Sequence, residues 1–128
     1  MRQEWEALYQ AALAVAKPKK LSEQMEAGWV GAAVLGAGGR IYTGVCIDTA
    51  CSLGFCAERA ALAAMFTAGE YRAQRVCAVA ADGRVLSPCG ACREFMMQLG
   101  EGAGEIEVLL DREGRTATLR ELMPEAWR

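Results

Sequence analysis

The sequence contains no histidine, and this absence excludes several kinds of active site. Without an imidazole the chain cannot form a Ser-His-Asp triad or a Cys-His pair. Any zinc ion that it binds tightly must be held mainly by cysteine thiolates, with a carboxylate or water as the other possible ligands. Metal chemistry in this chain therefore depends on its six cysteines.

The sequence also lacks a strong net charge, a long apolar run and a typical signal peptide. Fourteen basic and 16 acidic residues give a net charge of -2, which offers no basic surface to a polynucleotide. No apolar run reaches the roughly 18 residues that span a membrane, and the acidic, amphipathic start at residues 1–6 is unlike an export signal. We therefore expect neither a nucleic acid polymer nor a membrane as partner. We expect the cysteines to be reduced thiols in the cytoplasm rather than three disulfides.

The apolar residues that are present predict one mixed α/β domain over residues 1–128. A hydrophobic fraction of 53% is enough to fill one core in a chain of this length. Helical spacing marks residues 3–16, 56–68 and 90–99, with a last helical turn near 119–123. Five strands are expected at 29–35, 40–45, 75–81, 105–110 and 115–119. Helices covering a five-stranded sheet are the natural packing of these elements.

Two short motifs carry the chemistry. The first is Cys-Ala-Glu-Arg at 56–59, and after 28 intervening residues Pro-Cys-Gly-Ala-Cys follows at 88–92. Each begins at a predicted helix start, where partial positive charge and unpaired N–H groups lower the pKa of a thiol. Cys89 and Cys92 are three residues apart, so both can reach the ion that Cys56 binds. Three thiolates leave the fourth tetrahedral position for water, whose pKa falls towards about 7 on zinc; this is the arrangement of a catalytic site.

Charged residues within the motifs are candidates for the catalytic steps. Glu58 lies two residues after Cys56 and is predicted to move protons between the activated water and the substrate. The alternative is that Glu58 only complements the dipole of its helix. Arg59 and Arg93 each directly follow a motif residue, and we hypothesise that they donate hydrogen bonds to the sulfurs and offset their negative charge.

The remaining cysteines leave a structural site open as an alternative. Cys77 lies in the middle of a predicted strand and is most simply a small buried hydrophobe. Cys46 and Cys51 lie in a polar stretch from 46 to 55 that we expect to be irregular and to line the cavity faced by the metal. Either of them could supply a fourth ligand, which would make the zinc structural.

Together the two motifs resemble those of the small, homotetrameric cytidine deaminases and the related blasticidin-S deaminases. The likeness extends from about Gly31 to Trp127 and includes Gly-Arg-Ile-Tyr-Thr-Gly at 39–44 and Glu-Leu-Met-Pro at 121–124. It implies a three-layer α/β/α fold with a five-stranded mixed sheet and one zinc ion per subunit. It also implies hydrolytic release of ammonia from C4 of a cytosine-type ring, as in pyrimidine salvage.

The resemblance assigns the site residue by residue. It places the zinc ligands on Cys56, Cys89 and Cys92 and the proton shuttle on Glu58. The backbone N–H of Ala57 would bond to O2 of the ring, and the carbonyl of Ser87 would face the amine. Trp127 falls where the family has an aromatic residue that reaches a neighbouring subunit's site, although it could instead pack against its own core.

The contacts to the rest of the substrate differ from the family pattern. Cytidine deaminases typically carry Asn-x-Glu where this chain has Cys46 and Asp48, and a thiol cannot replace the hydrogen bonds of an amide. A phenylalanine that commonly stacks near the base corresponds to Gly28, with Trp29 one position later. The substrate is therefore cytidine or deoxycytidine, or else a modified cytosine nucleoside such as blasticidin S or another small aminated heterocycle. Two different functions stay open beside these, namely a non-catalytic zinc-binding module and, least favoured, polynucleotide editing.

Overall fold

The computed structural model describes residues 1–127, which form four α-helices, one 3₁₀ turn (Ala103–Glu105) and a seven-stranded sheet. The helices are α1 (Gln3–Val15), α2 (Ala57–Thr67), α3 (Gly90–Met97) and α4 (Leu119–Leu122). The strands are β1 (Lys19–Ser22), β2 (Met25–Gly36), β3 (Ile41–Thr49), β4 (Ala73–Ala80), β5 (Val85–Leu86), β6 (Glu107–Leu109) and β7 (Thr116–Thr118). Within the described residues, none of these helices has the length and apolar character needed to cross a bilayer.

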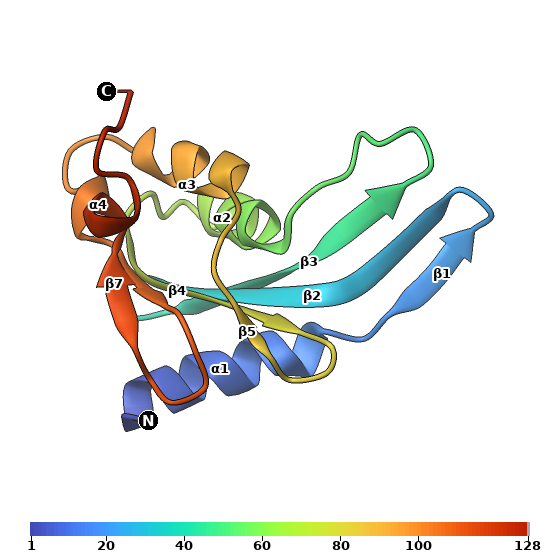
Figure 1. Cartoon of the computed structure of the whole chain (residues 1–128), viewed down its shortest axis with the longest axis horizontal. Coiled ribbons are helices and arrows are strands. Elements are labelled where there is room, and N and C mark those ends of the chain that lie inside the picture. Colours follow the sequence, from blue (N-terminus) through green and yellow to red (C-terminus); the bar gives the residue numbers. More distant parts are fainter. Residues whose placement is uncertain (128) are drawn as a thin grey trace.

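The elements form three layers, with the sheet between α1 on one face and α2 and α3 on the other (Figure 1). β2 pairs antiparallel with β3 and β4, whereas β4 and β6 run parallel, so the sheet is mixed. Alternate residues of β4 enter two separate cores. Val76 and Ala78 pack towards α2 and α3, and Cys77 and Val79 pack towards α1. The predicted three-layer mixed α/β fold is confirmed.

Three details of the sheet differ from the prediction. The five expected strands are present as β2, β3, β4, β6 and β7, but β1 and β5 are added to them. The four side chains of β1 are all exposed, and β5 has two residues, so neither leaves a readable pattern of burial. The first part of the stretch 46–55 is not irregular: β3 continues to Thr49, because Glu26 of β2 pairs with Asp48.

The position of α2 depends on a glycine in β3. A Cβ atom on Gly44 would lie 2.4 Å from the backbone nitrogen of Ala61 in α2. Only glycine therefore lets the helix pack this closely against the strand. Since Cys56 and Glu58 lie at the start of α2, this contact also sets how deep they lie over the sheet.

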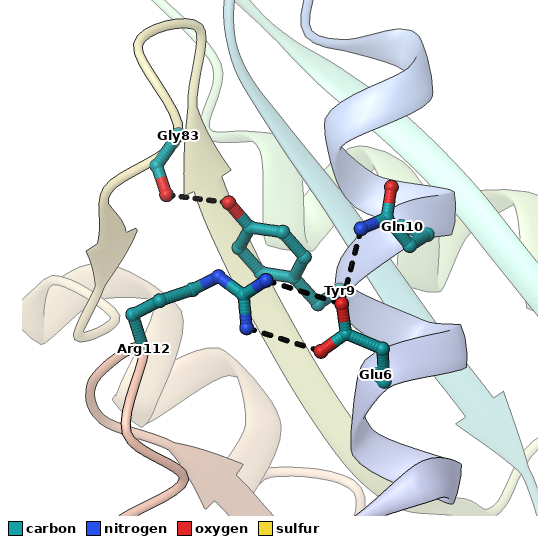
Figure 2. A network of polar contacts seen from close by, with 5 residues as sticks. All are labelled: Glu6, Tyr9, Gln10, Gly83 and Arg112. Atoms are coloured by element: carbon teal, nitrogen blue, oxygen red, sulfur yellow. Dashed lines mark hydrogen bonds and ion pairs between the residues drawn. The ribbon is translucent and has the colours of Figure 1, made fainter. Parts of the chain in front are cut away.

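A polar network holds α1 in place on its own face of the sheet, which is the face away from α2 and α3 (Figure 2). Arg112, in the β6–β7 turn, donates from its two Nη atoms to the carboxylate of Glu6 at 3.0 and 3.1 Å, and Gln10 donates to the same carboxylate at 3.1 Å. The guanidinium lies 4.0 Å from the ring centroid of Tyr9, whose hydroxyl donates to the carbonyl of Gly83 at 2.7 Å. These contacts join α1 to the β4–β5 and β6–β7 turns, away from the cysteine motifs.

Candidate metal centre and active site

Both cysteine motifs begin helices, as the sequence predicted. Cys56 is the N-cap of α2 and Cys89 is the N-cap of α3, each with extended backbone and no capping hydrogen bond from its side chain. Their sulfurs are therefore available for another partner. Glu58 and Cys92 follow in the first turns of the same two helices.

The three motif cysteines converge. The sulfurs of Cys56, Cys89 and Cys92 all lie within 4.8 Å of one another, and those of Cys56 and Cys89 are 3.5 Å apart. Around a tetrahedral zinc ion with Zn–S bonds of about 2.3 Å, two thiolates are separated by roughly 3.8 Å. The cluster therefore fits one zinc ion. Within residues 1–127 no further Cys, Asp or Glu joins this group, which argues against a closed four-ligand structural site.

The protonation of the thiols shows how much negative charge converges here. Burial opposes ionisation of Cys89, but the backbone N–H of Cys92 and the thiol of Cys56 hold the pKa of Cys89 below its usual value. The pKa of Cys92 is raised, first by burial and then by the nearby charge of Glu58. A divalent cation bound to these sulfurs would relieve this repulsion and keep all three as thiolates.

Glu58 is the one charged side chain that is buried in the described part of the chain, with 5% of its surface exposed. Burial raises the pKa of its carboxyl group, while contacts with Cys92 and Arg59 work in the opposite direction. A solvated residue that only complements a helix dipole would be exposed, so the burial favours the catalytic interpretation. A carboxyl group with a raised pKa is suited to accepting and returning a proton.

The two arginines play different structural roles. Contact with the Cys56 thiol raises the pKa of Arg59, whose guanidinium also lies 5.0 Å from the ring centroid of Phe55. Its Nε is buried without a hydrogen-bond partner. Arg93 instead donates to the carbonyl of Pro88 at 2.8 Å, the hydroxyl of Ser87 at 2.9 Å and the carbonyl of Leu122 at 3.2 Å. Arg93 thus positions the loop that leads to Cys89.

A hollow of about 160 Å³ opens beside the cluster. Cys56, Glu58 and Cys89 line it together with the predicted contacts Ala57 and Ser87. Sequence reasoning missed three other lining residues, namely Val30, Ala78 and Leu86. Their only signal is apolar character in strands, which a sequence cannot assign to a cavity rather than to the core.

Of the three remaining predicted substrate contacts, one lines the hollow and two do not. Cys46 lines the hollow and accepts a hydrogen bond from the backbone N–H of Val30 at 3.2 Å. Asp48 is exposed on the same strand, and its carboxylate lies 3.9 Å from the sulfur of Cys46. Trp127 is 72% exposed and lines other hollows, beside α3 and α4, so it does not complete the hollow of its own chain.

Comparisons with known proteins agree with this geometry. The family described as "Cytidine and deoxycytidylate deaminase zinc-binding region" matches residues 2–106. A cytidine deaminase of Mycobacterium tuberculosis is 35% identical over 99 residues, which cover 77% of this chain and 71% of that protein. One of Sporosarcina psychrophila is 34% identical over 120 residues, or 88% of each chain.

Solved structures extend the likeness to the whole described fold. The crystal structure of cytidine deaminase from Mycobacterium tuberculosis has a TM-score of 0.82 at 30% identity and covers 99% of both chains. The cytidine deaminase from Burkholderia pseudomallei has a TM-score of 0.77 at 30% identity, covering 99% of this chain and 100% of that one. In this chain the cysteine cluster and the buried Glu58 are thus found on a fold that resembles solved cytidine deaminases.

Proposed function

Because the chain belongs to the family of zinc-binding cytidine and deoxycytidylate deaminases, we propose that it converts cytidine and deoxycytidine to uridine and deoxyuridine and releases ammonia. The observation that carries this function is the cluster of three thiols beside a hollow that two of them, Cys56 and Cys89, line together with the buried carboxyl group of Glu58. The enzyme is a zinc-dependent hydrolase. Its reaction replaces the amine on C4 of the ring by the oxygen of a water molecule.

The residues divide into metal ligands and a proton carrier. Cys56, Cys89 and Cys92 would hold one zinc ion, which when bound supplies Lewis-acid activation of a water molecule. Glu58 takes the proton of that water and returns protons to the ring nitrogen and the leaving amine. Arg59 lies against the sulfurs and offsets their negative charge.

The orientation of the ring depends on groups next to the ligands. The backbone N–H of Ala57, at the start of α2, donates to O2 of the ring, and the carbonyl of Ser87 accepts from the amine. Both residues line the hollow, which supports this assignment. Arg93 keeps Ser87 in place through its hydrogen bond to the hydroxyl group.

The charges around the hollow favour a nucleoside over the nucleotide deoxycytidylate. None of the described residues that line the hollow is a lysine or an arginine. The nearby Arg93 is engaged with Ser87, Pro88 and Leu122, and Arg59 with the sulfurs and Phe55. A phosphate group would be desolvated there without a cationic partner, which is unfavourable.

Assembly and location follow from the family resemblance. We propose that residues 1–128 form a single deaminase domain and that four copies assemble, with Trp127 reaching the site of a neighbouring subunit. The exposure of Trp127 supports this arrangement. The free thiols support a reducing compartment, the cytoplasm, where the enzyme acts in pyrimidine salvage. Light scattering that gives a stable monomer would contradict the tetramer.

The test is ammonia release from a panel of cytidine, deoxycytidine, deoxycytidylate, cytosine and blasticidin S. The zinc-loaded protein should turn over the two nucleosides fastest. The matched control is Glu58→Gln, which should keep its zinc and its fold but lose roughly 100- to 10,000-fold in kcat. Turnover of deoxycytidylate above deoxycytidine would contradict the charge argument, and no turnover of any compound would favour a non-catalytic zinc-binding module.

A further inference from the structure

Three hydrogen bonds of Arg93 join two segments that are distant in the sequence. Its Nε donates to the carbonyl of Pro88 at 2.8 Å, one Nη donates to the hydroxyl of Ser87 at 2.9 Å, and the other donates to the carbonyl of Leu122 at 3.2 Å. Ser87 and Pro88 precede the predicted ligand Cys89, whereas Leu122 is the last residue of α4. One guanidinium therefore links the edge of the hollow to a short helix that does not line it.

The segment 87–89, which we call the ligand loop, has little other polar support. It lies between β5 and α3 and belongs to neither element. Pro88 has no backbone N–H to donate. Within residues 1–127, Arg93 is the one side chain that hydrogen-bonds to Ser87 or Pro88. The position of the loop, and with it the carbonyl of Ser87 and the sulfur of Cys89, therefore depends on this guanidinium.

At the other end of the link, α4 is held in place although it has only four residues. It packs beside α3 (Figure 1). Thr118 and Glu121 form a capping box at its start, with hydrogen bonds of 2.8 and 3.2 Å, and Leu119 is fully buried in the core below α2 and α3. The last carbonyl of a helix has no partner within the helix. For Leu122 that partner is Arg93.

The guanidinium of Arg93 acts through its shape rather than through its charge. Its three acceptors are all neutral, namely two backbone carbonyls and one hydroxyl group, and it forms no ion pair in the described part of the chain. A planar fork can donate in several directions at once, whereas the ammonium group of a lysine is a compact point charge. A lysine at this position would keep the charge but lose the link.

We propose that Arg93 is a positioning residue that makes α4 part of the active-site scaffold, because it couples the carbonyl of Leu122 to the ligand loop. The inference rests on the proposed function, in which this loop carries a zinc ligand and the carbonyl that accepts from the amine. It means that α4 influences the reaction from outside the hollow. A loosened α4 displaces Ser87 and Cys89 only while Arg93 connects them.

The test is a double-mutant cycle of Arg93→Ala and Thr118→Ala on the zinc-loaded protein. Ammonia release from cytidine gives kcat and KM, and a chelator gives the rate of zinc removal. Arg93→Ala should lower kcat roughly 10- to 100-fold, as for a displaced reacting group, and should speed zinc removal. KM should change less, because the lining of the hollow is retained. Thr118→Ala loosens the start of α4 and should lower kcat about two- to fivefold, but have no further effect in the Arg93→Ala background.

Two further variants separate the link from charge and from general stability. Arg93→Lys should behave like Arg93→Ala, although it keeps the positive charge. Arg115→Ala removes an exposed arginine that pairs with Asp111 in the β6–β7 turn, and it should change neither kcat nor the rate of zinc removal. If Arg93→Ala does not fold, Arg93→Lys takes its place in the cycle.

The outcomes distinguish failure of the link from failure of the proposed function. Independent effects of the two substitutions, whose fold-changes multiply in the double variant, would overturn the coupling to α4 while leaving the deaminase intact. Full activity of Arg93→Lys would also overturn it, because charge alone would then suffice. If the wild type releases no ammonia, the proposed function fails, and the rates of zinc removal decide on the link by the same comparison.

Discussion

Replacing Gly44 by alanine should lower the catalytic rate, although Gly44 does not line the hollow. The added Cβ would lie 2.4 Å from the nitrogen of Ala61, whereas ordinary contact begins at 3.4 Å, so α2 must retreat by about 1 Å. That helix carries Cys56 and Glu58 at its start. A displacement of this size in an active site can cost roughly 100-fold in rate. The overpacked contact should also destabilise the fold by about 1–3 kcal/mol.

The assay has to separate lost stability from lost geometry. Ammonia release gives kcat, urea unfolding gives the free energy of unfolding, and metal analysis gives the zinc content. Gly39→Ala is the matched control, because the Cβ would have no neighbour within 4 Å but the φ of +94° is strained for alanine. It should cost about 1–2 kcal/mol without moving α2. If Gly44→Ala and Gly39→Ala retain the same kcat, the reasoning about the position of α2 is wrong.

Three further predictions concern charge and thiol reactivity. Arg59→Ala should lower activity or zinc retention, since its guanidinium offsets the charge of the sulfurs; full activity with full zinc content would contradict that role. In the zinc-loaded protein a disulfide reagent should modify Cys51 first, because a hydrogen bond with Thr49 lowers its pKa. Cys77, whose pKa burial raises to about 12, should react only on unfolding, and mass spectrometry of the labelled peptides gives the order. Hydrogen bonds from Gln10 and Arg112 lower the pKa of Glu6 from its ordinary value of 4.5. The ionised carboxylate therefore stabilises the folded protein above pH 4.5, and this stabilisation is lost as the pH falls below 4.5 and the carboxylate is protonated. The Tm of the wild type should therefore fall more steeply than that of Glu6→Gln as the pH drops below 4.5; parallel curves would contradict this.

The chemistry of the site was predictable from the sequence because it depends on local spacing. Cys56 and Glu58, like Cys89 and Cys92, lie within one helical turn of each other, and the start of a helix places such neighbours on a common side. The lack of histidine meant, before any fold was known, that a tightly bound zinc ion had to be held mainly by sulfur. Apolar periodicity likewise predicted the order of the helices and the main strands.

What the sequence did not contain was the pairing of distant segments. The continuation of β3 through Asp48 depends on Glu26 across the sheet, so a polar stretch that resembles a loop became a strand. Edge strand β1 buries no side chain and so has no pattern to read.

The site itself is a product of tertiary structure. Two helix starts 33 residues apart bring the sulfurs of Cys56 and Cys89 to 3.5 Å because both helices pack on the same face of the sheet, one of them against Gly44. The residue types determined which reaction is possible. The packing of helices on the sheet decided where the motif residues meet, and which apolar side chains, such as Val30 and Leu86, line the hollow beside them.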